Sequence, residues 1–184
     1  MIKPRMLVLV VLDQPMDKYI LALDQSTQNT GYAIYKNDNL IEANCISPEG
    51  QYLTRIVKLI QWLKRMVNTL SEKGRVQVLI EEIQLQQIPG TSRDVNVKTF
   101  KQLAHVQGAI LEYLVENNIP YEIVASSTWK SLCGIKGRNR QEQKRNAQIY
   151  VVNTFGLKVN QDTADAICIG KSYILNQKKD FNWD

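Results

Sequence analysis

Histidine and cysteine are scarce in this chain of 184 residues, which contains one histidine and three cysteines. The cysteines, Cys45, Cys133 and Cys168, lie far apart and form no Cys-x-x-Cys pair. This spacing argues against a zinc knuckle and a disulfide framework, and we expect buried, reduced thiols. His105 has no evident serine or cysteine partner, so we expect it to pack or to lie at an interface rather than to activate a nucleophile.

Glycine and proline are also few, at 9 and 5 residues, and no apolar run approaches the roughly 20 residues that a membrane-spanning helix needs. With 44% hydrophobic and 22% charged residues, the chain has the composition of an ordinary globular protein. The apolar run at residues 6–12 follows Lys3 and Arg5 but lacks a small-x-small cleavage site. We therefore expect a cytoplasmic protein rather than a secreted one.

The length favours a single domain, and the formal net charge of +5 modestly favours a polyanionic partner. Met16 stands just before the first clear strand. We expect residues 1–17 to be an N-terminal extension, either from an early start codon or as an added edge strand. Residues 18–177 should form the domain, and residues 178–184 a loose C-terminal tail.

The order of the expected elements predicts an α/β fold. Apolar strands are predicted at residues 18–24, 31–36 and 40–46, and the short turns between them make this trio antiparallel. A helix at 51–72, a strand at 76–81, a helix at 97–116 and a strand at 121–125 follow, and then helices that are interrupted at 134–137 and 156–160. Because a helical crossover of this length joins parallel strands, we expect one mixed sheet of five strands flanked by helices.

Carboxylates end two of the apolar strands, at Asp24 and Glu81. A charge at such a position is costly unless it is paired or binds something, and the carboxyl ends of parallel strands are where open α/β sheets bind ligands. Asp162 and Asp165 are three residues apart at the start of the last helix, so they share one face. Each alone would suit a helix N-terminus. The apolar residues around Asp165 instead predict that it faces the sheet.

Four converging carboxylates without histidine or cysteine would select Mg²⁺ or Mn²⁺ over zinc. Two such ions, roughly 3.5–4 Å apart, can activate a water molecule and stabilise the leaving oxygen of a phosphodiester. The carboxylates therefore point to phosphodiester hydrolysis.

Four segments resemble the RuvC-like Holliday junction resolvases in order and spacing: ILALDQSTQNTGYA at 20–33, LIEE at 79–82, LAHVQG at 103–108 and DTADA at 162–166. The resemblance covers residues 18–176, and its first and last motifs are the specific ones. It implies a ribonuclease H-like fold and a homodimer that binds four-way DNA junctions and nicks two strands symmetrically. It also implies that two Mg²⁺ ions, for which Mn²⁺ can substitute, are held by Asp24, Glu81, Asp162 and Asp165.

The sequence departs from that family in the loop after Glu81. Bacterial members carry an aromatic residue there that inserts at the junction centre, whereas the nearest position here is Gln84, and the apolar candidates are Ile83, Leu85 and Ile88. Junction opening is thus left without an assigned residue. Glu82 is a candidate substitute for Glu81, although strand alternation lets only one of the pair face the site. The divergence and compact size suggest a phage or mobile-element variant, which would act in the host cytoplasm.

Positive charge is concentrated between residues 128 and 145, where six cations are opposed only by Glu142. Such runs are usually solvated faces, but Gly134 and Gly137 predict a flexible cationic loop suited to phosphate contacts. The expected DNA-binding residues are Lys130, Lys136, Arg138, Arg140, Lys144 and Arg145, joined by Arg93 and Lys98. The resemblance places catalytic and DNA-contacting lysines in this region, with Lys130 and Lys144 as the best matches, and we expect Lys130 to act in catalysis. Trp129 is expected to pack rather than to stack on bases.

Three other functions compete with this hypothesis. The first motif also resembles the phosphate loop of actin-like ATPases and sugar kinases, but those enzymes need two such domains and the chain lacks their glycine-rich adenosine motif. A ribonuclease acting on RNA–DNA hybrids would use the same metal geometry. A junction-binding protein without catalysis would not need four acids.

Overall fold

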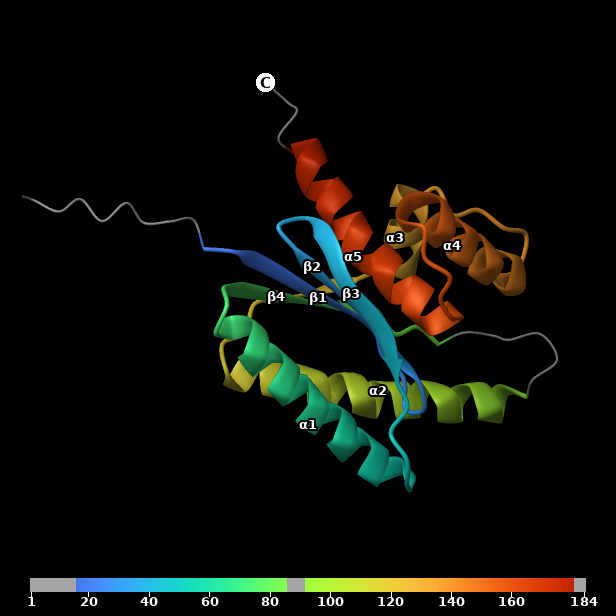
Figure 1. Ribbon diagram of the computed structural model, residues 1–184. Helices are drawn as coiled ribbons and strands as arrows, with labels where there is room; N and C mark the ends of the chain where they lie inside the picture. The colour runs from blue at the N-terminus through green and yellow to red at the C-terminus, as the bar shows by residue number, and fades with distance from the viewer. Residues whose placement is uncertain (1–15, 86–91, 181–184) are drawn as a thin grey trace, which may run out of the picture.

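The structure is a computed structural model that describes residues 16–85 and 92–180 (Figure 1). The strands are β1 Lys18–Asp24, β2 Thr30–Lys36, β3 Asn39–Ile46, β4 Arg75–Glu81 and β5 Tyr121–Val124. The helices are α1 Tyr52–Ser71, α2 Arg93–Glu116, α3 Ser126–Leu132, α4 Arg140–Phe155 and α5 Gln161–Asp180. In the described part of the chain, no helix is long and apolar enough to cross a membrane.

The five strands form one mixed sheet in the order β3-β2-β1-β4-β5. Strand β1 pairs antiparallel with β2 and parallel with β4, β2 pairs antiparallel with β3, and β4 pairs parallel with β5. The β2–β3 hairpin turns through Asn37 and Asp38, whose φ angles of 47° and 70° suit these residue types. The predicted fold class is therefore confirmed, including the antiparallel trio.

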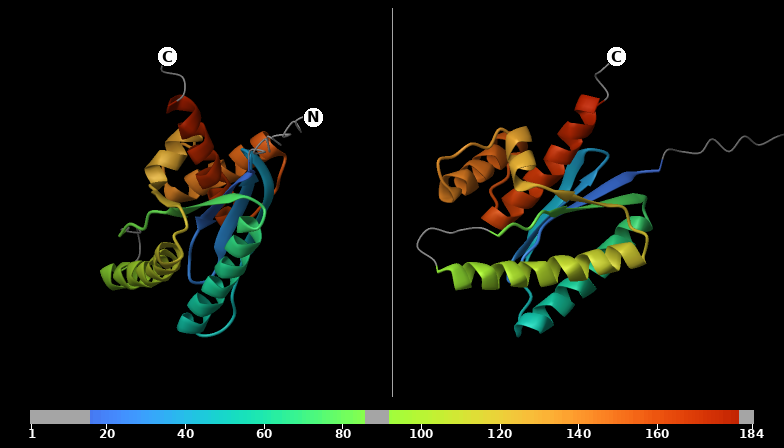
Figure 2. Two further views of the ribbon diagram at one scale, coloured as in Figure 1. Left: turned by 90° about the vertical axis from the view of Figure 1, so that its left-hand side faces the viewer. Right: turned by 180° about the vertical axis from the view of Figure 1, so that it is seen from behind.

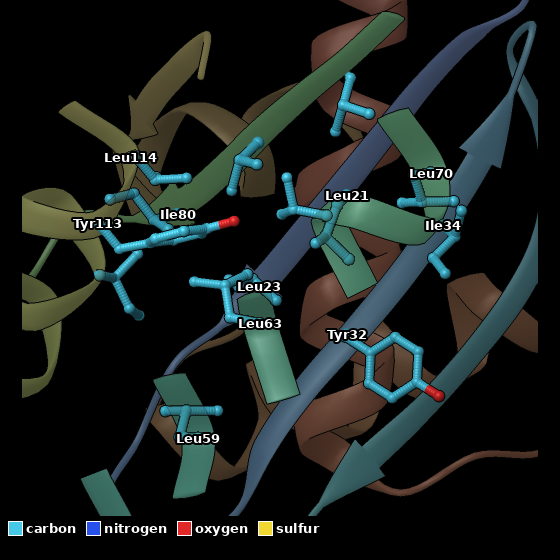
Figure 3. Close-up of a cluster of buried hydrophobic side chains, with 14 of the residues drawn as sticks. Leu21, Leu23, Tyr32, Ile34, Leu59, Leu63, Leu70, Ile80, Tyr113 and Leu114 are labelled. Atoms are coloured by element: carbon cyan, nitrogen blue, oxygen red, sulfur yellow. The ribbon is translucent and has the colours of Figure 1, made fainter. Parts of the chain in front are cut away.

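Helices cover both faces of the sheet (Figures 1 and 2). Because side chains alternate along a strand, Leu21 and Leu23 face α1 and α2, whereas Ile20 and Ala22 face the layer of α3, α4 and α5. Figure 3 shows the first of these two cores, in which large side chains from the sheet, α1 and α2 interdigitate. The acids at the strand ends belong to the second face.

The helices differ from the sequence prediction in where their apolar faces point. In α1, Leu53 and Val57 belong to the apolar residues that recur at helical spacing, but they are 67% and 54% exposed. Helix α2 begins at Arg93, four residues earlier than predicted, because the Ser92 hydroxyl accepts a hydrogen bond from the backbone N–H of Val95. Helix α5 continues to residue 180, past the expected domain end at 177.

The apolar residues that recur at helical spacing along α2 have two different surroundings. Ile110 and Leu114, in the C-terminal half, are buried in the core beneath the sheet. Phe100, Leu103 and Ala104, in the N-terminal half, are only partly buried and belong to neither core. This half of the helix extends beyond the sheet (Figures 1 and 2). Part of the apolar stripe is therefore left on the surface.

The predicted ends of the chain are described only in part. Of the expected N-terminal extension, residues 1–15 lie outside the described residues. Asp17 forms an ion pair with Lys36 at 2.8 Å and accepts a hydrogen bond from Asn37. Its carbonyl also accepts a hydrogen bond from the N–H of Arg75. Asp17 is thus already part of the folded domain.

Candidate active site

Asp24 and Glu81 lie at the carboxyl ends of adjacent parallel strands. The last pair in the β1–β4 register is Leu23 with Ile80, so the two acids are the next residues on each strand. Alternation places Asp24 on the face of Ala22, and Glu81 on the face of Leu79, which is the face covered by α3, α4 and α5. The two predicted carboxylates are therefore neighbours at one edge of the sheet.

Gln25 ties these two strand ends together. Its Nε2 donates a 2.6 Å hydrogen bond to the carbonyl of Glu81, and its Oε1 accepts a 3.0 Å hydrogen bond from the N–H of the same residue. The side chain is 4% exposed. A side-chain amide here takes the place of a backbone partner and continues the ladder one residue beyond the last strand pair.

The start of α5 brings Asp162 and Asp165 to the same place, and Gly31 permits the approach. Gly31 pairs with Asp24 in the sheet register. A Cβ atom on Gly31 would lie 2.0 Å from the carbonyl oxygen of Asp162, a separation that only glycine tolerates. The helix is capped by Asn160, whose Oδ1 accepts a 2.8 Å hydrogen bond from the N–H of Thr163. Asp162 is therefore not the N-cap.

The four acids interact electrostatically. Burial raises the pKa of Asp24 well above its usual value, and the charges of Glu81, Asp165 and Asp162 raise it further, while Lys144 opposes the shift. The pKa of Asp165 is likewise raised to about 7, first by burial and then by the charge of Glu81, against the opposing charges of Lys144 and Lys130. Asp165 is 8% exposed, and its Oδ1 is buried without a hydrogen-bond partner in the described structure. Uncompensated carboxylates of this kind are costly unless a cation joins them.

The donor set suits a divalent cation, although the carboxylates stand apart from one another. Within residues 16–85 and 92–180, no three acidic, histidine or cysteine side chains are close enough to ligate one ion as they stand. Like charges repel, so such carboxylates are expected to close up only around a cation. All four offer hard oxygen donors, and the unpartnered Oδ1 of Asp165 is the atom that most needs a positive partner. By charge, burial and chemistry, the residues fit Mg²⁺ or Mn²⁺.

Lys130 and Lys144 both lie near the acids. Each lowers the pKa of Asp165, and Lys144 also lowers that of Asp24. Lys130 comes from α3 and Lys144 from α4, so the charge is supplied by both helices that flank α5. The structure therefore places beside the acids the two lysines that the sequence singled out.

Trp129 is a packing residue, as expected, but it also makes a polar contact. It is 2% exposed, and its indole Nε1 donates a 3.0 Å hydrogen bond to Oε1 of Glu81. The Lys130 ammonium lies over its ring, 5.1 Å from the centroid. Glu82, by contrast, is exposed, and its Oε2 accepts a hydrogen bond from Gln84. Of the two adjacent glutamates, Glu81 is the one that faces the acids.

The other predicted cations are exposed on the surface. Lys136, Arg138, Arg140 and Arg145 are exposed on α4 and the loop before it, and Arg93 and Lys98 are exposed on α2. Arg145 lines a groove on α4 with Lys158, away from the face that Lys144 presents, since adjacent helical residues are about 100° apart.

The loop before α4 is anchored, contrary to the expectation of flexibility. Ile135 is buried and its N–H donates to the carbonyl of Lys130, while Asn146 donates to the carbonyl of Lys136. Asn139 caps α4. Of the apolar candidates for junction opening, Ile88 lies outside the described residues, Leu85 is exposed, and Ile83 is partly buried.

The sequence prediction missed three contributors to the site: Gln25, Gly31 and the indole N–H of Trp129. A signal existed for two of them, since Gln25 directly follows the first acid and Gly31 lies inside the first motif.

The structure also shows where His105 and the cysteines lie. His105 is exposed, with its Nδ1 2.8 Å from the hydroxyl of Tyr52, and of the cysteines only Cys45 is not buried.

Comparison with solved structures identifies the fold as that of RuvC, the ribonuclease H-like fold. Thermus thermophilus RuvC is 13% identical, with a TM-score of 0.64, and the match covers 88% of this chain and 96% of that one. T. thermophilus RuvC in complex with a Holliday junction substrate is 14% identical, with a TM-score of 0.62 and the same coverage. The yeast mitochondrial Holliday junction resolvase Ydc2 is 16% identical, with a TM-score of 0.52, covering 92% of this chain and 82% of its own.

The family is defined by a separate sequence match. Residues 16–175 match the family described as Lactococcus phage M3 protein, and the chain belongs to that family. No curated protein matches the sequence. At identities of 13–16%, the structural likeness establishes the fold, and the activity has to be argued from the site.

Proposed function

We propose that this protein is a metal-dependent endonuclease that nicks branched DNA, and four-way junctions in particular. The observation that carries the proposal is the convergence of four carboxylates, from β1, β4 and α5, beside Lys130 and Lys144 at one sheet edge. The RuvC fold supports it, because the similar structures are named as Holliday junction resolvases or contain a junction substrate. The phage name of the family supports a phage origin and action in the host cytoplasm.

The acids Asp24, Glu81, Asp162 and Asp165 would hold two Mg²⁺ ions, with Mn²⁺ as a substitute. When bound, the ions supply an activated water and neutralise charge on the phosphodiester. The protein's own share is to hold the carboxylates in place and to supply cations. Lys130 and Lys144, beside the acids, would bind the scissile phosphate and its neighbours.

The surface cations would position the DNA without reading its sequence. Lys136, Arg138, Arg140 and Arg145 are exposed on α4 and the loop before it, and Arg93 and Lys98 are exposed on α2. Contacts of Lys and Arg with phosphates dominate affinity for DNA and make it dependent on salt. A branched duplex suits such a surface because its arms lie on several sides of the scissile strand.

A homodimer would supply the second active site that symmetric nicking requires. Phe100, Leu103 and Ala104 lie at i, i+3 and i+4 on the half of α2 that extends beyond the sheet, so they form one partly exposed apolar patch. His105 is exposed next to them. An isologous contact between two such patches would bury them.

The turn after β1 disfavours the kinase alternative. A phosphate loop needs free backbone N–H groups. Here the Ser26 N–H donates to Oγ1 of Thr30, and the N–H groups of Gln28 and Asn29 both donate to Oγ of Ser26. Three backbone N–H groups of the turn are therefore already engaged within it. The ribonuclease alternative uses the same acids, so only the substrate distinguishes it.

One gel assay tests the function. Labelled four-way junction, Y-fork, linear duplex and RNA–DNA hybrid are incubated with the full chain in Mg²⁺, in Mn²⁺ and in chelator, beside Asp24→Asn and the exposed control Glu49→Gln. We expect metal-dependent nicks in the junction, lost in Asp24→Asn and kept in the control. Cleavage of the hybrid alone would establish the ribonuclease instead, and binding without cleavage would establish a junction-binding protein.

A further inference from the structure

Glu81 is the acid that the protein holds most firmly. Its carboxylate Oε1 accepts the 3.0 Å hydrogen bond from Trp129, which is itself 2% exposed. Its backbone N–H and carbonyl are both engaged by Gln25, which is 4% exposed. Asp165 offers a contrast, because its buried Oδ1 has no such partner in the described structure. Two buried side chains thus converge on one carboxylate residue.

The two contacts act on different parts of Glu81. Gln25 fixes the main chain, so it sets where the Cα–Cβ bond of Glu81 begins relative to Asp24 on the next strand. Trp129 acts at the far end of the side chain, where one N–H engages one of the two carboxylate oxygens. A glutamate has three rotatable side-chain bonds, and fixing both ends removes most of its freedom.

We propose that Trp129 and Gln25 are positioning residues for Glu81, which they orient so that Oε2 points to the divalent cations. This inference rests on the proposed function, since it concerns the same metal site. Hydrogen bonds from neighbouring groups commonly orient metal-ligating carboxylates in this way, and their loss typically weakens metal binding about 10–100-fold. The indole also carries Lys130 over its ring, so one side chain sets the direction of an acid and of an adjacent cation.

Trp129→Phe is the informative substitution, because it keeps an aromatic ring in the core and removes the N–H donor together with the second ring of the indole. The matched control is Trp62→Phe on the opposite face of the sheet, where the rings of Trp62 and Tyr32 pack at a tilt of 50° with their centroids 4.9 Å apart. The two variants make the same chemical change in two cores. A purely structural role of Trp129 would make them equivalent with respect to the metal.

The test is calorimetric titration of Mn²⁺ into the full chain without DNA. We expect Trp129→Phe to weaken Mn²⁺ binding about tenfold and Trp62→Phe to change it less than twofold. Glu81→Gln provides a second background. In that background Trp129→Phe should cause no further loss, because the indole acts through the Glu81 carboxylate. Equal losses in the two tryptophan variants, or a full additional loss in the Glu81→Gln background, would overturn the inference.

Gln25→Met tests the backbone contact in the same titration. Methionine has a similar length and no charge, and it removes both hydrogen bonds to Glu81. We expect at least a fivefold weakening of Mn²⁺ binding, against no change for Gln28→Met in the same turn. Thermal unfolding of each variant checks that it is folded. Unchanged Mn²⁺ affinity in folded Gln25→Met refutes its positioning role.

The result also separates this inference from the proposed function. If the wild-type chain binds no Mn²⁺, the metal site and this inference both fail. If the wild type binds Mn²⁺ and nicks junctions while Trp129→Phe and Gln25→Met behave like their controls, the proposed function stands and the inference alone fails.

Discussion

The two faces of the sheet are packed in different ways. The face against α1 and α2 is filled by large side chains such as Leu21, Leu63 and Tyr113. The face against α5 combines large residues such as Tyr35 with alanine, glycine and cysteine, and the small residues let the helix come close to the strands. The first arrangement buries much apolar area, and the second brings charged groups at the helix start to the sheet edge. Both faces therefore bury apolar side chains, and the second face also holds the acids.

The largest effect should come from the second face. Asp165→Asn removes one charge and one hard oxygen donor from the metal site, so we expect nicking of four-way junctions to fall at least a hundredfold, consistent with loss of metal catalysis. Binding to the junction in chelator should change little, because the cations that contact phosphate are kept. Gel-shift and nicking assays on the same preparation measure both. Nicking at the wild-type rate would contradict the metal assignment.

Substitutions in the face against α1 and α2 should change stability without changing activity. Leu63 is fully buried in α1, and Leu63→Ala should lower the free energy of unfolding by about 2–5 kcal/mol through lost contacts and a cavity. Nicking per folded molecule should stay within about twofold below the melting temperature. Urea unfolding measures the predicted loss of stability, and the nicking assay measures the predicted lack of change in activity. The exposed neighbour Leu53, changed to alanine, provides the control.

A substitution between the two faces should affect both properties. The Cβ of Gly31→Ala would meet the backbone of Asp162, so α5 must shift outward. We expect a loss of about 1–3 kcal/mol from overpacking, together with weaker Mn²⁺ binding as Asp162 and Asp165 move away from Asp24. Gly108→Ala, on the open side of α2, is the matched control, since a Cβ there meets nothing within 4 Å. A stability loss with unchanged Mn²⁺ affinity would show that the position of α5 does not determine metal binding.

The pH dependence of the metal-free protein should distinguish the faces more subtly. The pKa of Asp165 is about 7 when folded, against an ordinary value of 3.8, so the folded state binds the proton more tightly. Its contribution to stability is present below about pH 4 and is lost as the pH rises to 7. At pH 8 the free energy of unfolding of Asp165→Asn should therefore exceed that of the wild type by roughly 1–3 kcal/mol. Chemical denaturation in chelator at pH 5 and pH 8 measures this difference. If the difference in free energy of unfolding between Asp165→Asn and wild type is the same at both pH values, Asp165 does not titrate in this range.

The smallest effect should come from the surface cations. Lys136→Ala with Arg138→Ala should weaken binding of every branched DNA several-fold and lower the slope of log affinity against log salt by about 1–2. The control is Lys58→Ala with Lys64→Ala, on the exposed side of α1. An unchanged salt slope in the Lys136→Ala and Arg138→Ala variant would show that these two residues are solvated and do not contact DNA.

Much of this arrangement could be predicted from local patterns. Apolar runs bounded by turn residues located the five strands, and the acids at residues 24 and 81 stood out because a charge ended each of two runs. Helical periodicity was less reliable at the surface. Leu53 and Val57 fit the apolar spacing of α1, yet both are exposed, because the buried stripe of this helix is narrower and runs through Ile56, Leu59, Leu63, Val67 and Leu70. In α2, helical periodicity likewise does not distinguish the C-terminal half, which is buried in the core, from the N-terminal half, which is only partly buried.

The sequence by itself determined the order of the elements, the mixed sheet and which acids end its strands. Only the tertiary structure decided what each acid meets. Trp129 lies 48 residues from Glu81 in the chain, and Gln25 lies 56 residues from it, yet both bond to it. Periodicity reports which side of a strand or helix is apolar, because that property repeats along the chain. Which side chain lies across from another depends on how closely the layers approach, and here that is set by Gly31 and the small residues beneath α5.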